Sequence, residues 1–266
     1  MTASEQHGSR PWTLHHGDCL AGLRTLADKS VDVTITDPPY DKHVDAGFAT
    51  MGKHLPGKVN GRGKQQLVKH ASIGIGVMTD AKIRALACQL VRVTKRWINV
   101  FCAFEQLSTY QRELERAGGR YVRCGAWEKP DSTPQLSGDR PATWGECFVV
   151  AHANASGAMH WNGGGKRGLY KAGVCRGYER SEHPTQKPLS LMLDLVEDFS
   201  DPGELVLDPF AGSGTTGVAC NQLGRRFLGW ELDATYHEIA CRRLRGDEAK
   251  PRKEQPGLFD GLVNHG

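Results

Sequence analysis

The chain has 266 residues, of which 39% are hydrophobic and 24% are charged, and its mean hydropathy is −0.47. This composition is typical of a soluble globular protein and excludes a membrane protein and a disordered chain. The net charge is only +4, and the first ten residues hold no apolar segment of the kind a secretion signal needs, so we expect a cytoplasmic protein.

Apolar runs and helical patterns alternate along the chain. Short apolar runs predict seven strands, over residues 12–15, 31–36, 97–101, 121–127, 147–152, 205–207 and 226–230. Apolar residues that recur every three or four positions predict helices over residues 20–26, 83–90, 107–114, 189–199 and 236–244. This alternation predicts an α/β fold with a mainly parallel sheet. The turn-rich segment 130–141 joins two strands without a helix, so that pair should be antiparallel and close one edge.

Basic residues gather in two Gly-rich segments without strong periodicity, residues 41–72 and 152–182. Local positive charge on loops suits a polyanion, and long loops in compact domains are usually functional or disordered. The eight cysteines are scattered and show no metal-ligand spacing. We therefore expect reduced thiols and no metal site.

The strand predicted over residues 31–36 leads into Asp-Pro-Pro-Tyr. Two consecutive prolines lack N–H groups, so this turn presents hydrogen-bond acceptors. Asp37 and the carbonyl of Pro38 together can accept both hydrogens of an amino group, and Tyr40 offers a face on which a planar ring can stack. Because α/β sheets bind ligands at the carboxyl ends of their strands, the position favours a binding site over an ordinary surface turn.

A second motif, Asp-Pro-Phe-Ala-Gly-Ser-Gly-Thr-Thr at residues 208–216, follows the strand predicted over 205–207. A Gly-rich turn between a strand and a helix brings backbone N–H groups and a helix N-terminus close to a ligand. Glu231 ends the next strand, where a carboxylate can accept both hydroxyls of a ribose. No Lys follows the glycines, so the motif indicates a cofactor with a ribose but no phosphate chain.

These two motifs, with His-Pro-Thr-Gln-Lys-Pro at residues 183–188, resemble the β-class S-adenosylmethionine-dependent DNA amino-methyltransferases, in which the catalytic motif also precedes the cofactor motif. The resemblance is strong over residues 12–40 and 183–245 and is only a pattern over residues 97–152. It implies a Rossmann-like, doubly wound sheet of seven strands, one of them antiparallel, within a single catalytic domain over residues 1–266.

Within that domain, residues 41–72 and 152–182 would be insertions that contact DNA, and the chain from about residue 247 would be a mobile tail. Side chains of the second insertion could reach bases and phosphates; they are Trp161, Lys166, Arg167, Tyr170 and Tyr178.

The resemblance implies that Asp37, Pro38, Pro39 and Tyr40 form the catalytic motif, with Asp37 also adjoining the cofactor. Glu231 would hold the cofactor ribose. The remaining contacts to the methionine half and the loop around it would come from Asp208, Phe210, Gly212, Ser213, Gly214 and Thr215.

The same resemblance assigns Asp18 to the exocyclic amine of the cofactor adenine and the backbone N–H of Cys19 to a ring nitrogen. Asp18 could also cap the helix that begins near Cys19. Lys187 would meet the cofactor carboxylate in a pocket shaped by His183 and Thr185. The alternative is an ordinary helix start bounded by Pro188. Trp230 stands where the family usually has an aliphatic residue, and it could line the adenine pocket or simply pack.

The implied reaction is transfer of a methyl group from S-adenosylmethionine to the N6 atom of an adenine flipped out of double-stranded DNA. Family members that act on adenine usually carry Asp at the first motif position, whereas those that act on cytosine often carry Ser, so Asp37 favours adenine. The alternatives are methylation of cytosine N4, methylation of RNA, and a nonenzymatic DNA-binding module of the same fold.

Near the C-terminus, Gln255, Leu258 and Phe259 have the spacing Gln-x-x-Leu-Phe. This segment is similar to the short peptides with which bacterial DNA-replication proteins bind the sliding clamp. The clamp is therefore a candidate partner, and the alternative is that Leu258 and Phe259 pack back on the domain.

Overall fold

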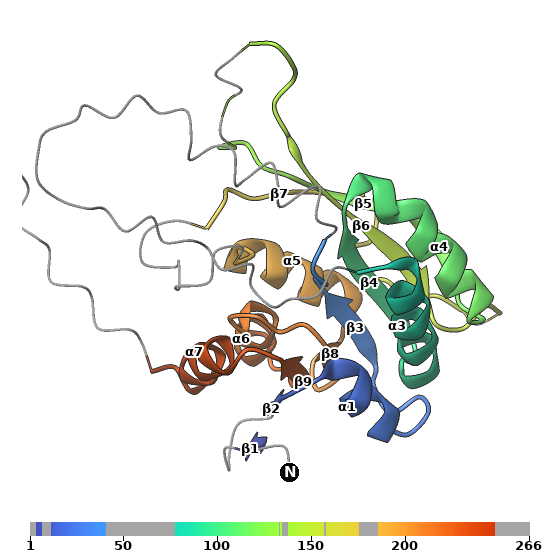
Figure 1. The fold of residues 1–266 in the computed structure, drawn as a ribbon, viewed down its shortest axis with the longest axis vertical. Helices are drawn as coiled ribbons and strands as arrows, with labels where there is room; N and C mark the ends of the chain where they lie inside the picture. Colours follow the sequence, from blue (N-terminus) through green and yellow to red (C-terminus); the bar gives the residue numbers. More distant parts are fainter. Residues whose placement is uncertain are drawn as a thin grey trace, which may run out of the picture.

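The structure, a computed structural model, describes residues 4–6, 12–40, 78–132, 134, 138–156, 158–175 and 186–247. These residues form one nine-stranded sheet with helices on both faces (Figure 1). The strands are β1 (Ser4–Gln6), β2 (Trp12–His16), β3 (Val33–Thr36), β4 (Trp97–Cys102), β5 (Arg120–Glu128), β6 (Gly145–His152), β7 (Leu169–Lys171), β8 (Leu205–Asp208) and β9 (Arg226–Glu231). The α/β prediction is confirmed.

The helices lie in two groups, one on each face of the sheet (Figure 1). Helices α1 (Cys19–Thr25), α3 (Asp80–Val93) and α4 (Leu107–Arg116) cover one face, and α5 (Leu189–Phe199), α6 (Thr215–Gln222) and α7 (Ala234–Arg245) cover the other. A short 3₁₀ turn, η1 (Phe104–Gln106), precedes α4. None of the helices in these described segments is both long enough and apolar enough to cross a membrane.

The order of the strands is β1-β2-β9-β8-β3-β4-β6-β5-β7. Strands β2, β9, β8, β3 and β4 are parallel to one another, whereas β6 is antiparallel to both β4 and β5. All seven predicted strands are present, and the predicted antiparallel pair is β5 and β6. That pair does not close the sheet, because β7 adds to β5 as the edge strand. Strands β1 and β7 have three residues each, too few to give a periodic signal.

The chain leaves β3 and β8 in opposite directions along the sheet. Strand β3 is followed by α3 and β4 on one side, and β8 is followed by α6 and β9 on the other. Ligands of doubly wound sheets bind outside the carboxyl ends of strands at such a switch point. The two motifs of the sequence lie there, since Asp37 follows β3 directly and Asp208 ends β8. The fold therefore brings together segments that are far apart in the sequence.

Trp230, at the unusual position in β9, packs between the sheet and α1. Its side chain is buried and stacks on His15, with the ring centroids 5.0 Å apart. A Cβ atom placed on Gly22 of α1 would lie 2.1 Å from Nε1 of Trp230. Gly22 therefore allows α1 to lie directly against the indole, and of the two alternatives for Trp230 the structure shows packing.

Replacing Gly22 by Ala should destabilise the protein by about 1–3 kcal/mol, because the added methyl group forces the indole or the helix to move. In an unobstructed helix the same change would stabilise by about 1 kcal/mol, so the sign of the effect identifies the contact. Urea unfolding measures it. Gly165→Ala, in a turn, is the control for the same change without a new contact, since apart from its chain neighbours no atom lies within 4 Å of a Cβ there. Equal stability of the two variants would contradict the packing described.

Candidate active site

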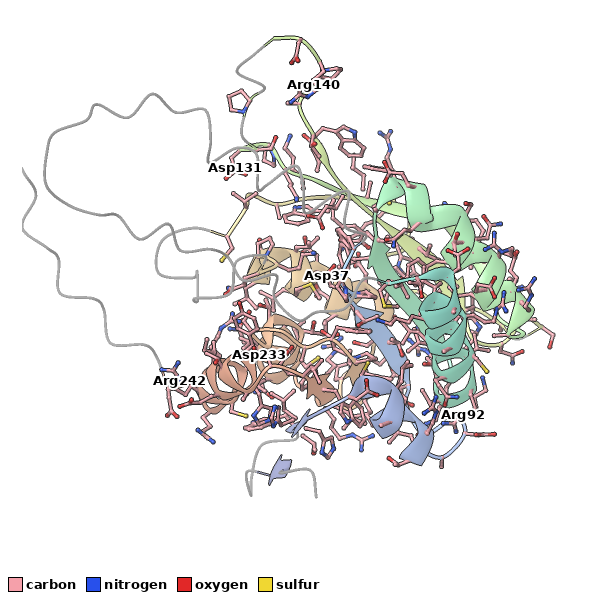
Figure 2. The ribbon with its side chains drawn as sticks, in the orientation of Figure 1. Asp37, Arg92, Asp131, Arg140, Asp233 and Arg242 are labelled. Atoms are coloured by element: carbon pink, nitrogen blue, oxygen red, sulfur yellow. The ribbon has the colours of Figure 1, made fainter. Side chains whose placement is uncertain are left out.

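The carboxyl ends of four neighbouring parallel strands each present an acidic residue. Asp18 follows β2, Asp37 follows β3, Asp208 ends β8 and Glu231 ends β9. Since these strands are adjacent and parallel, their ends gather at one edge of the sheet. Figure 2 labels Asp37 near the middle of the molecule, between the two groups of helices. The structure thus confirms that the predicted motifs share one edge.

Asp208 joins the two motif loops. Its Oδ1 atom accepts the Thr36 hydroxyl at 2.7 Å and the Phe210 N–H at 3.1 Å, and its Oδ2 atom accepts the Thr216 hydroxyl at 2.6 Å. The carboxyl group is buried, and burial raises its pKa to about 6. The sequence predicts direct cofactor contact for Asp208, whereas in the structure it holds the end of β3 against the Gly-rich loop.

The Gly-rich loop is tightly turned and is anchored on α7. Gly212 and Gly214 have φ values of 53° and 79°, in the left-handed region that favours glycine. Arg243 of α7 donates to the Ser213 carbonyl at 2.6 Å, to the Ser213 hydroxyl at 2.9 Å and to the Thr215 hydroxyl at 3.0 Å. The side chains of Ser213 and Thr215 therefore bond to α7.

Glu231 is held by two backbone donors. Its Oε2 atom accepts the Gly212 N–H and its Oε1 atom accepts the Asp233 N–H, each at 2.8 Å. The side chain is nearly buried, and burial raises its pKa above 4.5. A carboxylate oxygen can accept two hydrogen bonds, so this oriented group can also accept the two hydroxyls of a diol. The arrangement fits a ribose beside the Gly-rich loop.

Asp18 caps α1, as the alternative for this residue predicts. Its Oδ1 atom accepts the Ala21 N–H at 2.7 Å, and this side chain lies at the carboxyl end of β2, beside β9. The neighbouring Cys19 is buried, and burial raises the pKa of its thiol to about 12. Cys19 is therefore a neutral thiol at neutral pH, and only its backbone can offer an N–H to a ligand.

Four charged side chains and one tyrosine form a cluster around Asp37, which we call the Asp37 cluster: Asp37, Tyr40, Lys129, Glu146 and Lys187. Lys187 Nζ lies 2.5 Å from Asp37 Oδ2 and 3.0 Å from Glu146 Oε2. The Tyr40 hydroxyl lies 3.0 Å from Asp37 Oδ1 and 2.9 Å from Glu146 Oε2. Lys129 pairs with the other oxygen of Glu146. Every carboxylate of the cluster thus has a cationic partner.

Glu146 reaches this cluster because β6 runs against its neighbours. The first residues of an antiparallel strand lie beside the last residues of the parallel strand next to it, and Cys147 pairs with Cys102 at the carboxyl end of β4. The pairing of β6 with β5 sets Glu146 opposite Trp127. Sequence reasoning missed Glu146 and Lys129. The signal that could have found Glu146 is an acidic residue at the start of the strand expected to be reversed.

Aromatic rings surround the ammonium group of Lys187. Its Nζ atom lies 4.9 Å from the ring centroid of Phe101, 5.6 Å from that of Tyr40 and 5.8 Å from that of Trp127. Such positions are attractive for a cation. The sequence predicts that Lys187 meets a cofactor carboxylate, whereas the carboxylates that it contacts in the structure are those of Asp37 and Glu146.

The two carboxylates of the cluster titrate differently. Burial, the largest cause, raises the pKa of Asp37 above 3.8; Lys187 opposes this effect and Glu146 adds to it. Burial also raises the pKa of Glu146, but Lys187 and Lys129 outweigh it and bring the pKa to about 2. Burial, with the two carboxylates, raises the pKa of Tyr40 well above 10. Asp37 is therefore the better proton acceptor of the two, and Tyr40 is a neutral hydroxyl.

Side chains of the predicted DNA-contacting segment 152–182 have structural partners. Tyr170 is buried, and its hydroxyl donates to Asp198 at 2.9 Å. Lys166 pairs with the same buried carboxylate at 2.7 Å, and the Trp161 ring packs against Phe199. The prediction that these three side chains reach DNA is wrong for Tyr170, because Asp198 and the core hold it.

Several predicted residues and segments lie outside the described part of the chain. They are His183, Thr185, Tyr178, the segment 41–72, and the tail with Gln255, Leu258 and Phe259. Their roles stay predictions.

Comparison with known proteins gives consistent matches. A family model described as DNA methylase, N6_N4_Mtase, matches residues 31–242. The chain is 26% identical over 257 residues to type II methyltransferase M.HinfI of Haemophilus influenzae, covering 90% of this chain and 69% of that protein. It is 27% identical over 247 residues to type II methyltransferase M2.DpnII of Streptococcus pneumoniae, covering 88% and 90%.

Solved structures share the fold. The M1.HpyAVI–SAM complex superposes with a TM-score of 0.63 at 26% identity, over 88% of this chain and 98% of that chain. The cytosine-N4-specific PvuII DNA methyltransferase superposes with a TM-score of 0.64 over 90% of each chain, but at 13% identity this likeness concerns the fold alone.

Proposed function

We propose, from the premise that this chain belongs to the DNA methylase family matched over residues 31–242, that it methylates the exocyclic N6 atom of adenine in double-stranded DNA. The family makes it a DNA methyltransferase, and its methyl donor is S-adenosylmethionine. The observation that carries the proposal is the bond between Thr36 and Asp208, since it fixes Asp37, the next residue after Thr36, beside the Gly-rich loop.

The residues around that loop fit S-adenosylmethionine. Glu231 is oriented to accept the ribose hydroxyls, and the backbone around Gly212 faces the same place, since its N–H already bonds to Glu231. Phe210 is partly buried against the core and would cover the methionine half. Asp18 and the Cys19 N–H would receive the adenine. When bound, S-adenosylmethionine supplies an electrophilic methyl group.

The Asp37 cluster supports the other half of the reaction. A base inside a duplex must be flipped out at a cost of a few kcal/mol, and stacking on an aromatic ring such as Tyr40 offsets about 1–3 kcal/mol. Asp37 and the Pro38 carbonyl would accept the two hydrogens of the amino group, which directs its lone pair toward the methyl carbon. Asp37 would then accept the proton that the nitrogen loses, and its raised pKa suits that role.

Adenine is preferred over cytosine because of the residue at position 37. The resemblance associates Asp at the first motif position with adenine N6 and Ser with cytosine N4, and this chain has Asp37. The family model, by its name, covers both amino groups, so cytosine N4 is the second candidate. A nonenzymatic DNA-binding module is disfavoured, because such a module would not need Asp37, Tyr40, Gly212 and Glu231 assembled at one edge.

Product analysis tests the proposal. The purified chain is incubated with unmethylated genomic DNA and S-adenosylmethionine labelled in the methyl group, and the DNA is digested to nucleosides. Label in N6-methyladenine is the expected result. Label in N4-methylcytosine would mean that cytosine N4, and not adenine N6, is the target. No label in DNA would contradict enzymatic activity.

We also propose that the tail segment with Gln255, Leu258 and Phe259 binds a sliding clamp. Its support is the Gln-x-x-Leu-Phe spacing alone. The clamp should be retained by the full chain in a pull-down and lost on replacing Leu258 and Phe259 together by Ala. If the intact chain fails to retain the clamp, the tail has another role.

A further inference from the structure

Both oxygens of the proposed catalytic carboxylate already have donors inside the protein. The Lys187 Nζ atom lies 2.5 Å from Asp37 Oδ2, and the Tyr40 hydroxyl lies 3.0 Å from Asp37 Oδ1. A target amino group that donates to Asp37 must compete with these two donors. Lys187 and Tyr40 therefore need another acceptor when the target base binds to Asp37.

Glu146 offers the same two donors a second acceptor. Its Oε2 atom lies 3.0 Å from Lys187 Nζ and 2.9 Å from the Tyr40 hydroxyl. A hydroxyl has one hydrogen, so Tyr40 can fully donate to only one of the two carboxylates at a time, whereas an ammonium group has three hydrogens and can bond to both. Neither donor has to travel far to move from Asp37 to Glu146.

Lys129 keeps Glu146 in place for this exchange. It pairs with Oε1 of Glu146, which leaves Oε2 directed toward Lys187 and Tyr40. The side chain of Lys187 is only 9% exposed, and a buried ammonium group without a partner is strongly disfavoured. Without a charged group at position 146, Lys187 would have to stay on Asp37.

We propose that Glu146 is a positioning residue that takes over the Lys187 ammonium group and the Tyr40 hydroxyl when the target amino group binds, and so frees the oxygens of Asp37. The inference rests on the proposed function, because it takes Asp37 as the acceptor of the amino group. It adds a residue that no motif of the sequence contains. The alternative is that Glu146 only stabilises the fold.

Glu146→Gln tests this, since glutamine keeps the size of the side chain and removes its charge. We expect kcat to fall about 10- to 100-fold, the range for loss of outer partners that orient metal ligands, with the Kd for S-adenosylmethionine unchanged. The melting temperature should fall, because Lys129 and Lys187 lose a carboxylate partner, so kcat and Kd are measured well below it. Glu146→Asp retains the charge and should recover part of the lost kcat. Glu128→Gln is the control, because Glu128 is in an ion pair with Lys171 on the neighbouring strands and should keep the wild-type kcat.

The possible outcomes distinguish the proposed function of the protein from the role proposed for Glu146. No labelled product from the wild-type chain contradicts the proposed function and this inference with it. An active wild-type chain and a Glu146→Gln variant of equal kcat contradict the inference alone. A variant whose loss of kcat comes with weaker cofactor binding, or one whose loss Glu146→Asp does not partly recover, shows a structural role for Glu146. If Glu146→Gln does not fold, Glu146→Asp decides: a lowered kcat at an unchanged Kd for S-adenosylmethionine supports the inference, and a wild-type kcat contradicts it.

Discussion

Replacing Asp37 by Asn is expected to lower kcat for methyl transfer about 10²- to 10⁴-fold, the range for loss of a group that accepts a proton in the reaction. Asparagine is close in shape but is not a base, and its amide NH₂ would donate to the place where the target amino group must donate. Lys187 would also lose the carboxylate at 2.5 Å. Initial rates with labelled S-adenosylmethionine measure the effect.

Binding of S-adenosylmethionine should largely survive this change, because the hydrogen-bond partners of Glu231 are Gly212 and Asp233 rather than Asp37, and the proposed cofactor contacts come from β9 and the Gly-rich loop. Titration calorimetry of the variant measures that retention. Asp139→Asn is the matched control: Asp139 is an exposed partner of Arg140, and its loss should leave kcat unchanged. An active Asp37→Asn variant would contradict the assignment of the catalytic residue.

Replacing Glu231 by Gln should weaken binding of S-adenosylmethionine about 10- to 100-fold, since a hydrogen bond to a charged group contributes about 1.5–3 kcal/mol. The amide removes the charge and replaces one acceptor oxygen by an NH₂ group, which opposes either the Gly212 N–H or the Asp233 N–H. The ribose and the loop therefore lose the same partner. Titration calorimetry gives the Kd directly.

At saturating cofactor, kcat of Glu231→Gln should approach that of the wild type, because the Asp37 cluster is unchanged. Glu238→Gln, on the exposed side of α7, provides the control for loss of one carboxylate in the same region. A Kd equal to that of the wild type would remove Glu231 from the cofactor site.

The sequence predicts the part of the site that lies at the carboxyl ends of strands or directly after them. Asp37 and Glu231 could be placed because a buried apolar run precedes each of them and because the carboxyl ends of parallel strands share an edge. Seven strands follow from the same runs. These are local signals, and the fold assembles them through a rule that holds for all doubly wound sheets.

The partners of Lys187 and Tyr40 could not be predicted in this way. The Tyr40–Glu146 bond spans 106 positions and depends on the register of β6 between β4 and β5. The Lys187–Asp37 bond spans 150 positions and depends on how the segment before α5 packs against the end of β3. Tyr170 shows the converse, since an aromatic residue in a basic, Gly-rich segment has the composition of a DNA contact. Only the structure reveals the buried Asp198 that binds it.

The Asp208 carboxyl group links the proposed site for the target base to the proposed site for the methyl donor. It joins Thr36 of β3 to Phe210 of the Gly-rich loop and Thr216 of α6, so we expect a displacement of one motif to reach the other through a single buried side chain. Kinetic constants for DNA and for the methyl donor should therefore vary together among variants of these residues.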